Sequence, residues 1–160
     1  LDLLLEQVKL FRKNLLKATR MVRELSKKSL YTQRYENLIS IPGIGIVTAM
    51  SILTEIGDAS RFHNQREFAS FLGLIPSCHS SGESIASAEK TFRGNKHLGA
   101  LVIESAWISI RHDRAMAMAY GEYCKRMKAQ EAIIRVARKM SNRILSVLKS
   151  GKKYQYDKIR

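Results

Sequence analysis

The sequence predicts an all-α protein, in which a long N-terminal helix of coiled-coil type precedes a helical domain with a helix-hairpin-helix-like motif. Three observations predict this class. Apolar residues recur at steps of three and four along most of the 160-residue chain, which is the helical period. Glycine and proline residues interrupt these stretches. No convincing strand, internal repeat or low-complexity tract is found.

The N-terminal segment, residues 1–32, is predicted to be one long helix over residues 1–29. Its apolar residues alternate steps of three and four over about four heptads, which is the spacing of a coiled-coil seam. Basic residues occupy the outer face. The helix either packs on its own domain or forms a coiled-coil arm, and the second alternative predicts a homo-oligomer. The seam consists of Leu1, Leu4, Val8, Phe11, Leu15, Ala18, Val22 and Leu25.

The helical domain is expected over residues 33–150, followed by a basic tail at 151–160. Gly57 and Gly151 are predicted to end two of its helices, because glycine is favoured directly after a helix. Asn64, with Glu67 three residues later, predicts a capping box, and Asn95 predicts another helix start. The expected helices cover 34–40, 46–56, a short stretch after Asn64, 96–111, 115–128 and 130–149.

Residues 34–57 resemble a helix-hairpin-helix, a module that binds the DNA backbone without base specificity. Pro42 and Gly43 stop the first helix, and the second begins just after Gly45. Glycine here permits backbone conformations that a side chain forbids, and a close approach to another backbone. Amides at the start of the second helix suit a phosphate. Gly43, Gly45 and Thr48 are therefore nucleic-acid-binding candidates, and a tight turn used only for packing is the alternative.

The charge balance predicts a polyanionic partner. The chain has 28 Lys and Arg against 14 Asp and Glu, a formal net charge of +14. Such a field attracts DNA, RNA or an acidic membrane surface. No apolar stretch approaches the roughly 18 residues needed to cross a bilayer, so a membrane is not expected as a partner. The last predicted helix presents Arg135, Arg138 and Lys139 as further nucleic-acid-binding candidates.

Residues 76–94 have the composition of a loop rich in serine. A serine nucleophile needs exposure, room and stabilisation of developing charge, and Gly82 gives Ser81 room. No catalytic triad pattern accompanies it, and composition alone does not identify a catalyst. The four histidines lack ligand spacing and the acidic residues are scattered, so no metal site is predicted. Residues that could supply protons, charge or amide groups here are His79, Arg93, Asn95 and Lys96.

The linear order of motifs is more specific than any one of them. It runs through Ile-Pro-Gly-Ile-Gly (41–45), Thr-Glu-Ile-Gly-Asp (54–58), Arg61-Phe62, residues 68–76, Ser-Ser-Gly (80–82), Gly94-Asn95 and Glu-Ser-Ala-Trp (104–107). This order is similar to the C-terminal domain of the bacterial insertion-sequence transposases related to the pilin-gene invertase. The similarity covers roughly residues 36–150.

The resemblance implies a two-part recombinase for DNA transposition in the bacterial cytoplasm, associated with the nucleoid. A RuvC-like domain with four acidic residues and Mg²⁺ comes first, then a coiled coil, then this domain. The implied nucleophile, which becomes linked to a DNA strand, is Ser81, with Ser80 as the fallback. DNA is the implied partner, and some members are guided by a structured RNA. This chain itself is expected to hold no cofactor, and to bind nucleic acid without completing strand exchange.

Two departures from the family pattern stand close to the serine loop. Family members usually have a glycine and then an Ile-Thr-Lys stretch where this chain has Ala88, Lys90, Thr91 and Phe92. An arginine usually follows the leucine at position 98, and this chain has Gly99 there. Fewer basic residues near the serine imply weaker phosphate contacts, a diverged copy of the element, or compensation by Arg93 and Lys96. The alternative function, independent of these departures, is a non-catalytic helix-hairpin-helix module that binds DNA or RNA.

Overall fold

A computed structural model describes residues 1–75 and 94–156. All regular structure in these two ranges is helical, which confirms the all-α prediction. The elements are α1 (Asp2–Ser26), α2 (Ser29–Ile39), α3 (Ile46–Ile56), the 3-10 turn η1 (Ala59–Arg61), α4 (Gln65–Phe71), α5 (Lys96–Ser109), α6 (Arg114–Cys124) and α7 (Ala129–Ser150).

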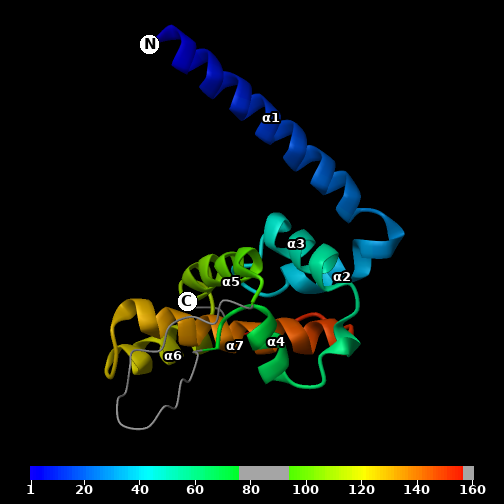
Figure 1. The fold of residues 1–160 in the computed structure, drawn as a ribbon. Coiled ribbons are helices and arrows are strands. Elements are labelled where there is room, and N and C mark those ends of the chain that lie inside the picture. Colours follow the sequence, from blue (N-terminus) through cyan, green and yellow to red (C-terminus); the bar gives the residue numbers. More distant parts are fainter. Residues whose placement is uncertain (76–93, 157–160) are drawn as a thin grey trace.

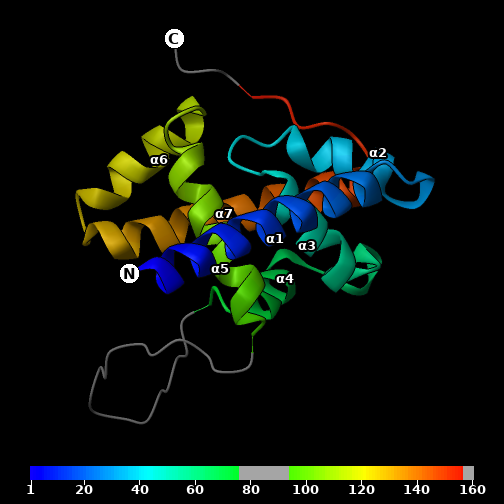
Figure 2. The ribbon, with the colours of Figure 1, turned by 90° about the horizontal axis from the view of Figure 1, so that it is seen from above.

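Helix α7 is the centre of the domain and contacts α2, α4, α5, α6 and η1. Figure 2 shows it running through the middle of the other helices. Its predicted apolar face is buried, with Val136, Met140 and Ile144 fully so. Burying one such side chain stabilises the fold by about 1.5–3 kcal/mol, so this face is a main contributor to the core. The helix ends at Gly151 as predicted, where φ is 65°.

Polar side chains set the starts of three shorter helices. The carbonyl of the Asn64 side chain accepts from the Glu67 amide at 2.9 Å, and Asn95 accepts from Leu98 at 3.0 Å, so both predicted caps are confirmed. The Glu67 carboxylate accepts from the amide of His63 rather than from that of Asn64. Helix α6 begins at Asp113, a cap that the sequence patterns did not reveal.

Helix α1 projects from the domain (Figure 1). Its seam is exposed over the first half of the helix: Leu1 is 92% exposed and Phe11 69%. Only Val22, Leu25 and Ser26 reach the core near its end. Within the described part of the chain, the alternative that this helix packs along its own domain is therefore wrong for its first five turns.

The chain turns sharply after α1. The helix ends at Ser26 and α2 begins at Ser29, earlier than the expected start at residue 34. Lys28 between them has extended backbone angles. The break lets Leu25 on one helix and Tyr31 on the next both pack against the core. Residues 29–32, predicted to belong to the N-terminal segment, thus form the first turn of α2.

The described part of the basic tail, residues 151–156, lies along α2 (Figure 2, red). The Asn37 side chain donates to the Gly151 carbonyl at 2.7 Å, and the Tyr154 amide donates to the Ser40 hydroxyl at 2.7 Å. The guanidinium of Arg143 lies 4.7 Å from the centre of the Tyr154 ring. The two hydrogen bonds fix the tail beside the end of α2, next to the turn of the α2–α3 hairpin.

Candidate nucleic-acid interface

The α2–α3 hairpin is built on a turn whose apolar residues enter the core. Ile41 is fully buried and Ile44 is 5% exposed. Gly43 has φ of 93°, and a Cβ on it would lie 2.2 Å from the carbonyl oxygen of Ser105 in α5. The close backbone approach expected at this glycine is confirmed, and its partner is the main chain of α5. Gly43 therefore serves packing.

Gly45 and the start of α3 form the open side of the same turn. A Cβ on Gly45 would meet nothing within 4 Å. The first helical hydrogen bond of α3 runs from the Ala49 amide to the Gly45 carbonyl, so the preceding amides have no partner inside the helix. Gly45, directly before this helix start, borders a hollow of about 570 Å³ that is lined by Pro42, Gly43, Ile44, Gly45, Ile108, His112 and Tyr156.

Thr48 does not present its side chain to this hollow. The residue is 8% exposed, and its hydroxyl lies 3.4 Å from that of Ser105. The position of Thr48 in the first turn of α3 predicts a nucleic-acid-binding side chain, and this prediction is wrong for the side chain. Its side chain instead joins α3 to α5, because residue 48 lies on the face of α3 that is turned toward the core.

Gly73 and Gly94, which flank the serine-rich segment in sequence, face each other at close range. Gly73 has φ of 67°, and a Cβ on Gly94 would lie 2.4 Å from the Gly73 α-carbon. The Asn95 amide donates to the Phe71 carbonyl at 2.7 Å. The chain therefore leaves α4 and enters α5 at one place. Five candidates lie between these points, outside the described residues: His79, Ser80, Ser81, Gly82 and Arg93.

Asn95 and Lys96 stand at the entry to α5. Both polar atoms of the Asn95 side chain have protein partners: the oxygen caps α5, and the nitrogen donates to a Glu55 carboxylate oxygen at 3.2 Å. Asn95 thus ties the start of α5 to the end of α3. Lys96, in the first turn, is exposed.

The structure gives a physical reason for Gly99. This residue is buried, and a Cβ on it would lie 2.3 Å from the carbonyl oxygen of Leu72. Helix α5 can approach the end of α4 this closely only without a side chain at this position. The absence of the basic residue expected after Leu98 therefore follows from close packing in this chain.

A basic groove lies between α4 and α7 and has a volume of about 880 Å³. Arg135, Arg138 and Lys139, all predicted from the basic face of α7, line it. Arg66 on α4 and Tyr123 on α6 join them. No sequence pattern indicates Arg66 or Tyr123: Arg66 lies far from α7 along the chain, and Tyr123 is an uncharged residue of the preceding helix. The remaining lining residues are Asn64, Gln65, Ala69 and Asn142.

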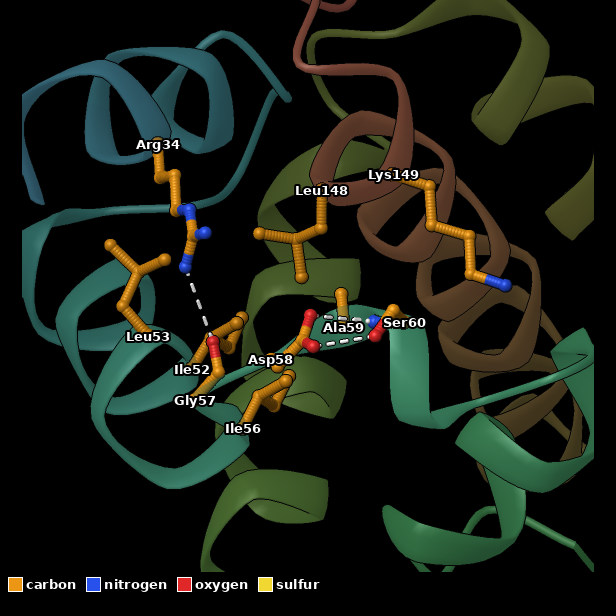
Figure 3. A pocket seen from close by; sticks show the side chains of 10 residues that line it. All are labelled: Arg34, Ile52, Leu53, Ile56, Gly57, Asp58, Ala59, Ser60, Leu148 and Lys149. Carbon is orange, nitrogen blue, oxygen red and sulfur yellow. Dashed lines mark hydrogen bonds between the residues drawn. The ribbon is translucent and has the colours of Figure 1, made fainter.

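A smaller hollow of about 340 Å³ lies where the Thr-Glu-Ile-Gly-Asp motif meets α7 (Figure 3). Arg34 donates to the Gly57 carbonyl at 3.3 Å, and Lys149 donates to that of Phe62 at 2.6 Å. Hydrogen bonds from the Ser60 hydroxyl and amide, with the nearby charge of Arg34, lower the pKa of Asp58. The charged side chains around this hollow, those of Arg34, Asp58 and Lys149, are thus bonded within and between α2, α3, η1 and α7. The Thr-Glu-Ile-Gly-Asp motif is therefore structural.

Among residues 1–75 and 94–156, no three His, Cys, Asp or Glu side chains come together, so these residues do not fit a Mg²⁺ site. None of the described helices is both long and apolar enough to cross a bilayer.

Comparison with known proteins adds to this geometry. A family profile described as the transposase IS116/IS110/IS902 family matches residues 35–121, from α2 into α6. The chain is 36% identical over 89 residues to the transposase for insertion sequence element IS1111A of Coxiella burnetii, covering 56% of this chain and 24% of that protein.

Two further relatives match a longer stretch. The insertion element IS110 uncharacterized 43.6 kDa protein of Streptomyces coelicolor is 32% identical over 119 residues, covering 74% of this chain and 29% of that protein. The pilin gene-inverting protein of Moraxella bovis is 32% identical over 124 residues, covering 73% of this chain and 37% of that protein. The matched part of the chain thus spans between 24% and 37% of the length of these relatives.

Proposed function

The chain belongs to the IS116/IS110/IS902 family of transposases, and on this premise we propose that it is the DNA-binding, serine-bearing part of a recombinase that cleaves and exchanges DNA strands. One observation supports the proposal above the others. The matched region, residues 35–121, contains the turn of the hairpin with α3, the Gly73–Gly94 junction and the whole serine-rich segment. The family match therefore covers both the serine-rich segment and the Gly73–Gly94 junction from which that segment departs.

Ser81 is the proposed nucleophile. Its hydroxyl oxygen forms an ester bond to the phosphorus of a DNA phosphodiester as the bond to one deoxyribose oxygen breaks. The serine proton leaves, and the departing deoxyribose oxygen gains one. Attack by a second strand end reverses these changes and frees the serine. The proposed stabilisers of the charge on the phosphate are Arg93 and Lys96, and His79 is the proposed proton carrier.

The test is Ser81→Ala in a full transposase that carries this chain, with Ser80→Ala as the matched control. Ser81→Ala should abolish the covalent protein–DNA adduct on a denaturing gel while DNA binding in solution persists. Ser80→Ala should leave the adduct. An adduct that survives Ser81→Ala but not Ser80→Ala moves the nucleophile to Ser80. Survival in both variants and in the double variant favours the non-catalytic helix-hairpin-helix module.

DNA is proposed to contact two surfaces of the domain. The unpartnered amides at the start of α3, beside Gly45, suit a phosphate of a duplex, since the positive end of the helix dipole lies there. The basic face of α7, with Arg135, Arg138 and Lys139, adds charge. The same net charge of +14 supports a structured guide RNA as a further partner. A protein that binds DNA in these ways is proposed to act in the bacterial cytoplasm, at the nucleoid.

The projecting part of α1 is proposed to pair with a second copy. Its seam exposes Leu1, Leu4, Phe11 and Leu15, each more than half accessible. A seam at heptad spacing is covered when two such helices coil together.

Mg²⁺, which the described residues do not fit, is proposed to be held by acidic residues of a RuvC-like domain elsewhere in the protein. No step proposed here passes through it.

A further inference from the structure

The basic groove brings together cations from two elements that are distant in sequence. Arg66 stands on α4, and Arg135, Arg138 and Lys139 stand on α7. Ala69, a small residue that is 3% exposed, lines the groove from α4. Because its side chain is short, space remains between the basic side chains of the two helices. The groove therefore presents positive charge from both walls to whatever enters it.

The charges of the groove are not neutralised within the described residues. None of its lining residues is a carboxylate. The ion pairs of residues 1–75 and 94–156 include the exposed pairs Lys27–Glu24, Lys125–Glu122 and Lys153–Glu36, and none involves the four groove cations. Like charges held close together repel one another unless an anion lies between them. Arginine forks, moreover, match phosphate oxygens two at a time.

The groove also offers flat surfaces at one end. The Arg135 guanidinium lies 6.0 Å from the centre of the Tyr123 ring, and Tyr123 is partly exposed. Bases of an unpaired strand can stack on such surfaces, whereas bases in a duplex are covered by their neighbours. A single row of phosphates can also reach both walls of a hollow between two helices. A duplex carries its phosphates on the outside of a wide, stiff cylinder.

We propose that the basic groove binds a single-stranded segment of DNA, with its phosphates held by Arg66, Arg138 and Lys139 and a base stacked at Tyr123 and Arg135. The inference rests on the proposed function, because strand cleavage and exchange expose unpaired DNA beside the cut. It adds a second kind of DNA contact to the hairpin, which faces duplex phosphates. The groove would keep a freed strand close to the domain until it is rejoined.

The test measures binding of this chain to a labelled oligothymidylate, and to a duplex of the same length, by fluorescence anisotropy over a range of salt. The double variant Arg66→Gln/Arg138→Gln should weaken single-strand binding at least ten-fold at low salt. It should also lower the slope of log affinity against log salt by about 1.4, for two lost phosphate contacts. Duplex binding should change far less.

Arg12→Gln/Lys17→Gln, on the projecting part of α1, is the matched control, because it removes the same charge away from the groove. Tyr123→Leu should weaken single-strand binding about ten-fold, and Tyr123→Phe should retain it. Circular dichroism checks that each variant is folded. Three results would overturn the proposal. Both double variants could lose single-strand affinity equally, or the groove variant could lose duplex affinity as strongly as single-strand affinity. An RNA oligomer of the same length could also compete more strongly than the DNA.

The outcome is separable from the fate of the proposed function. If the groove inference fails alone, the Ser81-dependent adduct still forms in the full transposase. If the proposed function fails, no serine adduct forms, whatever the groove binds.

Discussion

Gly43, in the α2–α3 turn, lies against the main chain of α5 so closely that a Cβ on it would stand 2.2 Å from the carbonyl oxygen of Ser105. Gly45, two residues later, has open space where its Cβ would be. One glycine of the Pro-Gly-Ile-Gly motif is thus needed for packing, and the other lies on the open side. Packing accounts for Gly43, and Gly45 stands where the proposed contact with a DNA phosphate would be made.

Gly43→Ala should destabilise the domain, by about 2–4 kcal/mol, because it combines backbone strain at positive φ with a clash against backbone that cannot move aside. Gly45→Ala should change stability by less than about 1 kcal/mol. Urea denaturation of both variants, followed by circular dichroism, measures the difference. A loss of duplex binding in folded Gly45→Ala would assign the DNA contact to the open side, and similar stabilities would contradict the packing role of Gly43.

Gly99→Arg restores the basic residue that the family usually carries and should nevertheless harm this chain. The new side chain would meet the Leu72 carbonyl, since even a Cβ would be 2.3 Å from its oxygen. We expect a loss of about 1–3 kcal/mol, as for an overpacked core. Thermal melting measures it, with Ala100→Arg at the exposed neighbouring position as control. An unchanged melting temperature would show that α4 and α5 can separate at this point.

Asp113 is expected to be the most sensitive carboxylate in the described helices. It is fully buried, accepts from the Ala115 and Met116 amides at 2.9 and 3.2 Å, and pairs with Arg143 on α7. Asp113→Ala removes a helix cap and leaves the mostly buried charge of Arg143 without its partner. The expected loss is about 3–5 kcal/mol in urea denaturation. Glu122→Ala, which breaks the exposed pair with Lys125, should lose less than about 1 kcal/mol; comparable losses in the two variants would refute this.

The proposed pairing of α1 predicts a change of mass when its seam is charged. Leu4→Glu/Phe11→Glu places carboxylates in the seam and should convert the assembly to a monomer, because charges buried between two helices are unfavourable. Lys13→Glu/Arg20→Glu, on the outer face of the same helix, is the control and should keep the assembly. Light scattering after size-exclusion chromatography gives both masses. A monomer for the unmodified chain would already reject the pairing.

The sequence by itself determined the helices and most of their ends, the caps at Asn64 and Asn95, the basic face of α7, and a resemblance that the family profile confirms. These features depend on residues within a few positions of one another, or on the order of motifs along the chain. Local hydrogen bonds and helical periodicity are readable from such spacing. Ser81 was also proposed at this level, and it stays a prediction.

Tertiary structure alone decided which of these local features face one another. It placed Gly43 on Ser105, turned the Thr48 side chain inward, and explained Gly99 by the Leu72 carbonyl. It added Arg66 and Tyr123 to the basic residues of α7 and left the α1 seam exposed. Such relationships join residues from separate helices, and their geometry follows from how whole helices pack. No local pattern encodes that packing, because the contacting residues are tens of positions apart and each could satisfy its own helix in several arrangements.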